Sequence, residues 1–211
     1  MPTPRRTSLL EIVREGRHIL ESEGLEQLTM ARVARAAGVR APSLYKHVRD
    51  RGDLIRLIGN DAVAELGARI RAAAGSGDPR QDLHAMARVH RAFAHDYPET
   101  FRLLWSRLPD DWRFDADLNA RLTEPLLRSV AALAGEGDAL VAARTFVGWA
   151  QGFVSMELAG AFRLGGDVDA AFDYGLTRLT AALSCPEPPP RSSPAARLPT
   201  ASLQQSSTIS A

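Results

Sequence analysis

The residues 29–48 read TMARVARAAGVRAPSLYKHV, and this stretch decides the fold. Thr29 is of a type that caps helices, and apolar residues follow it at helical spacing for two turns. Gly38 interrupts the pattern, and Pro42 stands in the first turn of a second short helix, where its missing N–H group costs nothing. The stretch therefore predicts two short helices joined by a tight turn, because glycine can adopt the positive φ that a steep crossing requires.

The second of these helices, expected at about residues 41–47, has an outer face that suits nucleic acid. Leu44 and Val48 are four residues apart and are expected to pack inward. The outer face then carries cations, hydroxyls and an imidazole. Its residues are Arg40, Ala41, Ser43, Tyr45, Lys46 and His47. Thr29 and Arg51 stand at the starts of the flanking helices, where N–H groups and a cation suit phosphate. A mixed surface on an ordinary helical hairpin is the alternative.

Composition and charge narrow the class of protein. The 211 residues are 45% hydrophobic and 24% charged, which indicates a globular chain. The formal net charge is +1, but residues 1–60 hold 11 basic and 7 acidic side chains, and residues 27–49 hold five basic ones and no acid. Such a local basic patch favours nucleic-acid binding more than the total charge does. Cys185 is the single cysteine, which excludes a disulfide scaffold and a cysteine-rich zinc site.

The rest of the chain is expected to be helical. Ser8 and Glu11 form a capping box at the start of a first helix. A helix capped by Asp50 is expected to reach about residue 74, although Gly52 in its first turn favours a late start. Apolar stripes at helical spacing continue to residue 184, and no strand alternation interrupts them, so the fold class is all-α. Prolines and a Ser/Thr/Gln run make residues 185–211 a predicted disordered tail.

No long apolar run indicates a membrane span, and no short one after the N-terminus indicates a signal peptide, so a cytoplasmic protein is expected. The histidines at 84, 90 and 95 are spaced six and five residues apart, which does not gather metal ligands on one helical face. No fingerprint of a nucleotide-binding loop or of a hydrolase is present. The sequence therefore predicts neither a catalytic residue nor a metal or cofactor.

Residues 29–48 resemble the helix-turn-helix of TetR-family transcriptional regulators. The likeness rests on Thr29, Val33, Ala34, Ala37, Gly38, Val39, Leu44, Tyr45, His47 and the acid-capped start at Asp50. It implies that residues 1–60 form a three-helix DNA-binding domain whose third helix reads the major groove of an operator. By position, it assigns DNA contacts to Arg40, Ala41, Pro42, Ser43, Tyr45, Lys46 and His47.

The C-terminal half carries a weaker likeness. Residues 148–160, GWAQGFVSMELAG, and residues 168–183, VDAAFDYGLTRLTAAL, are similar to the last two helices of a TetR subgroup named for a Trp-His-Gly motif, with Gln151 in place of the histidine. The resemblance implies that residues 61–184 form a helical domain for ligand binding and dimerisation. From the residues alone, two such apolar helices are either a monomer core or a dimer seam. The candidate dimer contacts are Phe146, Gly148, Gly152, Val154, Phe172, Leu176, Leu179 and Leu183.

Two polar residues, His90 and Glu157, fall within apolar stripes. One interpretation is that they are hydrogen-bonded inside the core, with Glu157 paired to an arginine. The other is that they line a ligand cavity together with aromatic side chains, since such cavities have few polar groups. The candidate ligand residues on this second interpretation are His90, Phe93, Tyr97, Phe101, Trp105, Trp149, Phe153 and Glu157.

These observations predict a non-enzymatic, ligand-responsive regulator, a repressor that binds a roughly palindromic operator as a homodimer and responds to a small-molecule effector. The alternative is a helical small-molecule-binding or enzymatic protein whose N-terminal hairpin does not bind DNA. The basic, acid-free face at residues 29–49 argues against that alternative.

Overall fold

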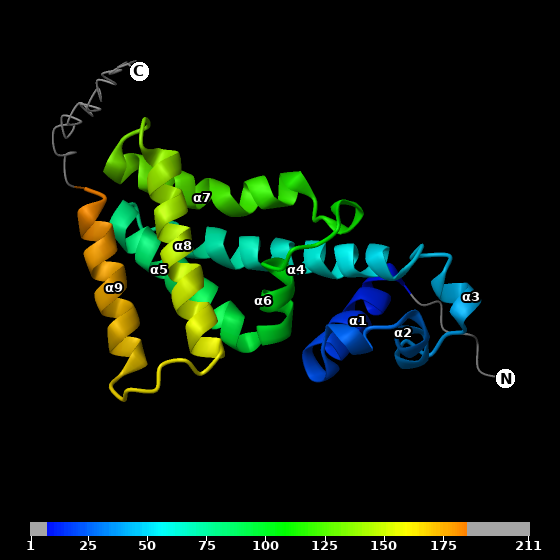
Figure 1. Cartoon of the computed structure of the whole chain (residues 1–211). Coiled ribbons are helices and arrows are strands. Elements are labelled where there is room, and N and C mark those ends of the chain that lie inside the picture. The colour runs from blue at the N-terminus through cyan, green and yellow to red at the C-terminus, as the bar shows by residue number, and fades with distance from the viewer. Residues whose placement is uncertain (1–7, 185–211) are drawn as a thin grey trace, which may run out of the picture.

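The computed structural model describes residues 8–184, and all regular structure in this range is helical (Figure 1). The expected all-α class is confirmed. The predicted tail and Cys185 lie outside the described residues. None of the described helices is long and apolar enough to cross a membrane. The elements are α1 (Leu9–Glu23), η1 (Leu25–Gln27), α2 (Met30–Ala36), α3 (Ala41–Leu44), α4 (Arg51–Ala73), α5 (Pro79–Asp96), α6 (Pro98–Leu104), η2 (Asp110–Trp112), α7 (Ala116–Ala134), α8 (Ala139–Leu158) and α9 (Val168–Ala182).

The helices of the N-terminal third begin at the capping residues that the sequence indicates. The Ser8 hydroxyl accepts from the Glu11 N–H group, and the Glu11 carboxylate accepts from the Ser8 N–H group, which completes the capping box. Thr29 and Asp50 each accept from an N–H group one turn further on. Gly38 takes φ 67°, the left-handed conformation that lets the chain turn between α2 and α3.

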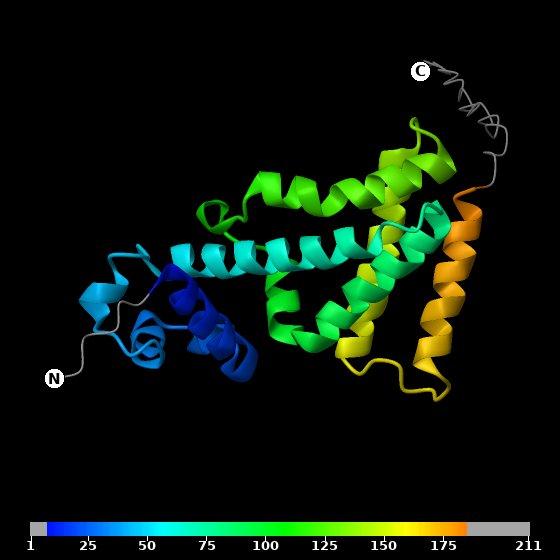
Figure 2. The ribbon, with the colours of Figure 1, turned by 180° about the vertical axis from the view of Figure 1, so that it is seen from behind.

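The 23-residue helix α4 connects two hydrophobic cores. Figures 1 and 2 show α1–α3 gathered at one end of α4 and α9 at the opposite end of the molecule. The side chains of α4 around Ile58 belong to the N-terminal core. The buried residues of this core are Ile12, Val13, Ile19, Leu20, Leu28, Val33, Ala34, Leu44, Val48, Leu54, Ile55, Ile58 and Leu103. Further along, Leu66 and Ile70 join the C-terminal core with residues such as Phe93, Phe146 and Phe172. The domain boundary predicted at residue 60 therefore falls inside one continuous helix.

Helix α4 begins at Arg51, so the expected late start is wrong. Gly52 sits in the first turn because the Trp112 indole of η2 packs against its backbone, and a Cβ there would lie 2.1 Å from Trp112 Nε1. Gly59, two turns later, is covered in the same way by the Phe114 ring. At both glycines, the absence of a side chain leaves room for an aromatic ring from the segment between α6 and α7.

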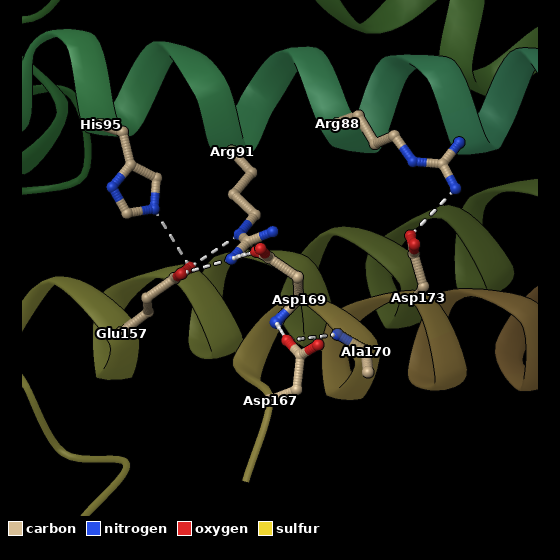
Figure 3. Close-up of polar contacts among 8 residues, drawn as sticks. All are labelled: Arg88, Arg91, His95, Glu157, Asp167, Asp169, Ala170 and Asp173. Carbon is tan, nitrogen blue, oxygen red and sulfur yellow. Dashed lines mark hydrogen bonds and ion pairs between the residues drawn. The ribbon is translucent and has the colours of Figure 1, made fainter.

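An ion-pair cluster joins α5 to α8 and α9 (Figure 3). Arg91 Nε lies 2.8 Å from Glu157 Oε2, and Arg91 Nη2 lies 2.6 Å from Asp169 Oδ1 at the start of α9. His95 Nε2 lies 3.2 Å from Glu157 Oε2. The Arg91 guanidinium, more than the burial that opposes it, lowers the pKa of Glu157. The structure therefore confirms the interpretation in which Glu157 pairs with an arginine.

Candidate nucleic-acid interface and ligand pocket

The α2–turn–α3 unit is held on the N-terminal core by its apolar residues. Val33, Ala34 and Leu44 are buried, and the Val39 N–H group donates to the Ala34 carbonyl at 2.9 Å to close the turn. Gly38 supplies the positive φ at this point. The unit lies at the free end of α4, away from α5–α9 (Figure 2). Its outer surface is consequently open to a large partner.

The division into an inner and an outer face is as expected. Leu44 and Val48 are 0% and 1% exposed. All of the residues assigned to the outer face are exposed: Arg40, Ala41, Pro42, Ser43, Tyr45, Lys46 and His47. Neither Arg40 nor Lys46 forms an ion pair with any residue in the described range, so both cations are free to meet phosphate. Arg35 and Arg49, which were not assigned contacts, are exposed beside them.

Helix α3 is shorter than expected. It ends at Leu44, and residues 45–47 form a turn in which the His47 N–H group donates to the Leu44 carbonyl at 3.0 Å. The Val48 N–H group also donates to the Leu44 carbonyl, at 3.1 Å, so Val48 returns to the buried face at the end of the turn. Tyr45, Lys46 and His47 therefore project from a turn and not from a regular helix. Tyr45 is 53% exposed.

Arg51 occupies a different position from the one expected. Its Nε donates to the Leu28 carbonyl at 2.8 Å and its Nη2 donates to the Leu25 carbonyl at 2.7 Å, while the guanidinium lies over the Trp112 ring. These bonds anchor the segment before α2 to the start of α4. The side chain points toward the protein, so we leave Arg51 out of the candidate interface. Thr29 is exposed, with its hydroxyl engaged in capping α2.

A buried carboxylate fixes the end of the interface segment. Asp53 is 6% exposed and accepts from the Arg49 N–H group at 3.0 Å and from Arg56 Nη2 at 2.6 Å. Burial raises the pKa of Asp53, but the Arg49 and Arg56 hydrogen bonds outweigh it, and the pKa lies below its ordinary value. The backbone at residue 49, directly after the exposed turn, is thereby held to α4.

Two side chains of α1 connect this module to the rest of the molecule. The Glu21 carboxylate accepts from the Thr100 N–H group at 2.6 Å and from the Glu99 N–H group at 3.2 Å, so it caps α6, which has no capping side chain of its own. Arg17 Nη1 lies 2.5 Å from Glu65 of α4, and its guanidinium lies over the Tyr97 ring. Sequence reasoning missed both links, because the partners are far apart along the chain.

A cavity of about 100 Å³ lies among α4, α5, α7 and α8. Of the candidate ligand residues, only His90 and Trp105 line it. Phe101 does not line this cavity, and its ring centroid lies 5.1 Å from that of His90. The remaining wall is apolar and was not anticipated residue by residue: Leu66, Ile70, Met86, Ala87, Leu122, Leu126, Phe146, Val147 and Ala150, with Thr123 at the edge.

The other candidate ligand residues lie elsewhere. The Phe93 and Tyr97 rings contact each other at a tilted angle, and both face the guanidinium groups of Arg17 and Arg69. Trp149 and Phe153 pack on the ring of Phe172. Glu157 belongs to the ion-pair cluster. Helical spacing showed that these aromatics face inward, but it could not distinguish a ring that lines a cavity from one that fills the core.

The candidate dimer contacts divide into two groups. Phe146, Val154, Phe172 and Leu176 are at most 3% exposed and belong to the C-terminal core of the same chain, so their assignment to a dimer surface is wrong. Trp149 stacks on Phe172 with ring centroids 5.3 Å apart. Leu179 and Leu183 are half-buried against the same core. Gly148 and Gly152 are exposed on the outer face of α8.

A helix-turn-helix with an open, basic outer face, joined by one long helix to a helical domain with a cavity, defines a DNA-binding regulator with a separate helical sensor domain. Two family models match this chain. Residues 12–58 match the bacterial regulatory proteins of the tetR family, and residues 83–179 match the tetracyclin repressor-like C-terminal domain. Together these matches cover more than half of the chain. The chain belongs to the TetR family, which confirms the resemblance stated from its sequence.

Several proteins are similar to most of the chain. An uncharacterized HTH-type transcriptional regulator of Mycobacterium tuberculosis is 29% identical over 185 residues, which are 85% of this chain and 83% of the relative. A structure from Rhodococcus sp. RHA1 superposes with a TM-score of 0.74 at 21% identity, over 87% of this chain and all of the other. A possible TetR family regulator from Streptomyces coelicolor A3(2) superposes with a TM-score of 0.65 at 22% identity, over 83% and 98%. These structures share the fold.

Proposed function

We propose that this protein is a transcriptional repressor that binds a palindromic operator as a homodimer and releases it in response to a small-molecule effector. The observation that carries the proposal is the exposed segment 40–47, which presents two unpaired cations and three hydroxyl or imidazole groups with no acid among them. Such a set suits the phosphates and base edges of a major groove. A DNA-binding protein of this kind acts beside the chromosome, in the cytoplasm.

The fold match supports the arrangement on DNA. BioQ has been crystallised with its double-stranded DNA operator, and that structure superposes on this chain with a TM-score of 0.61 at 22% identity, over 84% of this chain and 98% of the other. In a two-fold dimer, each copy would offer its α3 to one major groove. The two half-sites would then be about 34–36 Å apart, or a multiple of one DNA turn.

The outer face of α8 is the surface we assign to the dimer. One stripe of its exposed residues recurs at intervals of four and three and is mostly small: Val141, Thr145, Gly148, Gly152 and Ser155. A Cβ built on Gly148 or Gly152 meets no atom within 4 Å, so the stripe is open enough for a second helix to approach closely. On α9, Tyr174 is a large side chain that is 65% exposed.

The DNA-binding half of the proposal is tested with an operator selected in vitro by the purified chain. Lys46→Ala should weaken binding to all sequences and reduce the magnitude of the logarithmic salt slope by about 0.9, because one phosphate contact is lost. Tyr45→Phe should weaken binding by about 1 kcal/mol if the hydroxyl makes one hydrogen bond. Arg80→Ala removes an exposed cation at the far end of α5 and serves as the control. Unchanged affinity and slope in both α3 variants would refute the assignment.

The dimer half is tested at Gly152. Gly152→Arg fits the isolated chain, because nothing lies within 4 Å of the new Cβ, but it places a charge and a long side chain between two closely packed copies. Light scattering after size exclusion should show a dimer for the parent and a monomer for the variant. Ala120→Arg, at an exposed position of α7, should remain dimeric. A dimeric Gly152→Arg protein would refute the interface.

Membership of the family favours regulation over the alternative of a helical binding protein or enzyme with an idle hairpin. The Trp-His-Gly subgroup stays a prediction. The effector is expected to occupy the cavity between α5 and α8, because that cavity opens against α4, the helix that carries the DNA-binding module. A ligand in this cavity can change operator affinity only to the extent that its own affinity differs between the DNA-binding and the DNA-releasing conformation of the protein.

A further inference from the structure

The stretch that carries the candidate DNA contacts is fastened at both of its ends to the first turn of α4. Before it, Arg51 Nε donates to the Leu28 carbonyl at 2.8 Å and Arg51 Nη2 donates to the Leu25 carbonyl at 2.7 Å. After it, the Arg49 N–H group donates to the Asp53 carboxylate at 3.0 Å. Where the outer face between these anchors stands on the protein therefore depends on the side chains at positions 51 and 53 keeping one arrangement.

The two anchors are not equally constrained by their surroundings. Asp53 is short, 6% exposed and also accepts from Arg56 Nη2 at 2.6 Å, so its carboxylate is held in one place. Arg51 is long and only half-buried. An arginine loses more rotamer freedom than most side chains when it is fixed. Arg51 therefore needs a further contact if it is to stay on the two carbonyls.

The ring of Trp112 makes that contact. The guanidinium carbon of Arg51 lies 6.0 Å from the centroid of the ring, a distance at which a cation is attracted to an aromatic face. The indole also lies against the backbone of Gly52, since a Cβ built there would come within 2.6 Å of three of its atoms, Nε1, Cδ1 and Cε2. The ring is thus seated on the residue between the two anchors, where it limits the directions that the Arg51 side chain can take.

Trp112 reaches this position from a distant part of the chain. It ends η2, in the segment between α6 and α7, and this segment passes across α4 (Figure 1). Another contact fastens the segment to the same helix, since the Asp115 N–H group donates to Asn60 Oδ1 at 2.9 Å. Trp112 does not belong to the outer face at residues 40–47. An effect of Trp112 on DNA binding must therefore pass through Arg51 and the backbone that Arg51 holds.

We propose that Trp112 is a positioning residue for operator binding, and that its ring holds Arg51 on the Leu25 and Leu28 carbonyls and thereby fixes the segment that reads the operator. The proposal rests on the proposed function, because it takes residues 40–47 to be the reading segment. Base edges are read only by side chains that stand in the correct place, whereas the attraction between cations and phosphates tolerates a loosely held segment. Loss of the ring should therefore reduce specific binding and leave non-specific binding unchanged.

The test measures the affinity of full-length variants for an operator selected in vitro and for random DNA of the same length, by fluorescence anisotropy at one salt concentration. Trp112→Ala should lower the ratio of the two affinities about tenfold, because Arg51 then has to be ordered during binding. Trp112→Phe, which keeps a ring beside the guanidinium, should retain most of the ratio. Arg51→Met removes both carbonyl hydrogen bonds and should lower the ratio as much, and adding Trp112→Ala to it should lower the ratio no further.

Two glycine substitutions separate positioning from stability. Gly52→Ala displaces the intact Trp112 ring and should lower the ratio as Trp112→Ala does, with no effect in a Trp112→Ala background. Gly59→Ala, the matched control on the same helix, displaces Phe114 instead and should leave the ratio unchanged even though it destabilises the chain. Each variant is melted first, and its DNA binding is measured well below its melting temperature. If Trp112→Ala does not fold, Gly52→Ala decides the question.

Three results would overturn the proposal: an unchanged ratio in Gly52→Ala or Trp112→Ala, an equal loss in Gly59→Ala, or additive losses from Arg51→Met and Trp112→Ala. A loss of random-DNA affinity as large as the loss of operator affinity would also overturn it. A parent that prefers its operator, with Trp112 variants that prefer it equally, contradicts this inference alone. A parent with no preference for any selected sequence contradicts the proposed function and this inference with it.

Discussion

The substitution Gly59→Ala tests how the loop between α6 and α7 is seated on α4. Alanine normally stabilises a helix interior by about 1 kcal/mol over glycine. At this position, however, the new Cβ would lie 1.9 Å from Phe114 Cε1 and 2.4 Å from its Cδ1. Carbon atoms in contact are about 3.5–4.0 Å apart, so the ring has to move by roughly 2 Å. Because α4 is fixed in both cores, the ring and its loop are what must shift.

The expected magnitude follows from these opposing effects. Overpacking of this kind is unfavourable by about 1–3 kcal/mol, and the half-buried ring loses part of its contact with α4 when it leaves. Subtracting the helix-propensity gain of about 1 kcal/mol leaves a net destabilisation of up to about 2 kcal/mol. Urea unfolding followed by circular dichroism at 222 nm measures this difference directly.

Gly67→Ala is the matched control on the same helix. Gly67 is buried, but the nearest atom to its Cβ is Arg71 Nη1 at 3.2 Å, the end of a flexible side chain. That variant should be stabilised by up to about 1 kcal/mol. In a Phe114→Ala background, Gly59→Ala should become stabilising too, because the obstacle is gone. If Gly59→Ala stabilises the parent as much as Gly67→Ala does, the ring is not seated on α4 and the reasoning fails.

Three further predictions concern polar side chains that are partly buried between helices. Glu21→Ala should lower the free energy of unfolding by about 1–2 kcal/mol, measured in urea, because the first N–H groups of α6 lose their acceptor; Glu21→Gln should lose less. Arg91→Met should destabilise the chain by about 2 kcal/mol at pH 7 and by less below pH 4.5. The lowered pKa of Glu157 contributes stability that is present above the unfolded pKa of 4.5 and is lost as the pH falls through the folded pKa. An effect of Arg91→Met that does not depend on pH would contradict this. His90 binds its proton near pH 6.5 in the unfolded chain and only near pH 4 in the folded chain, so the free energy of unfolding should fall as the pH drops between these values. His90→Leu should remove up to about 3 kcal/mol of that fall. Urea unfolding midpoints recorded from pH 7 to pH 4 measure the difference.

Local rules predicted the beginnings of helices well. The caps at Ser8, Thr29 and Asp50 act over three residues, so the chain segment itself contains both partners. The same holds for the turn at Gly38. The inward position of Leu44 and Val48 followed from their spacing alone. The buried and exposed faces of the candidate DNA-binding segment were therefore predicted correctly, although its helix ends sooner than expected.

What covers an apolar face could not be predicted. Periodicity showed that Phe172 lies on an apolar stripe, but a stripe looks the same whether a neighbouring helix or a second copy packs on it. Gly52 appeared to weaken a helix start, because its partner Trp112 comes sixty residues later. His90 was recognised as a polar residue on an inner face. Which of the surrounding aromatics share a cavity with it depends on the crossing of α4, α5 and α8, which no single segment encodes.

The core of the DNA-binding module includes Leu103, a residue of α6, and the rings of Trp112 and Phe114 pack against it from the following loop. Exchanging the first sixty residues between relatives would thus separate this core from one of its buried residues and from the aromatic rings that cover it. Chimeric regulators built from this chain should fold only when residues 98–114 travel with residues 8–60. For the same reason, substitutions in the two segments are expected to occur together during evolution. A change in operator preference should then be accompanied by substitutions in residues 98–114.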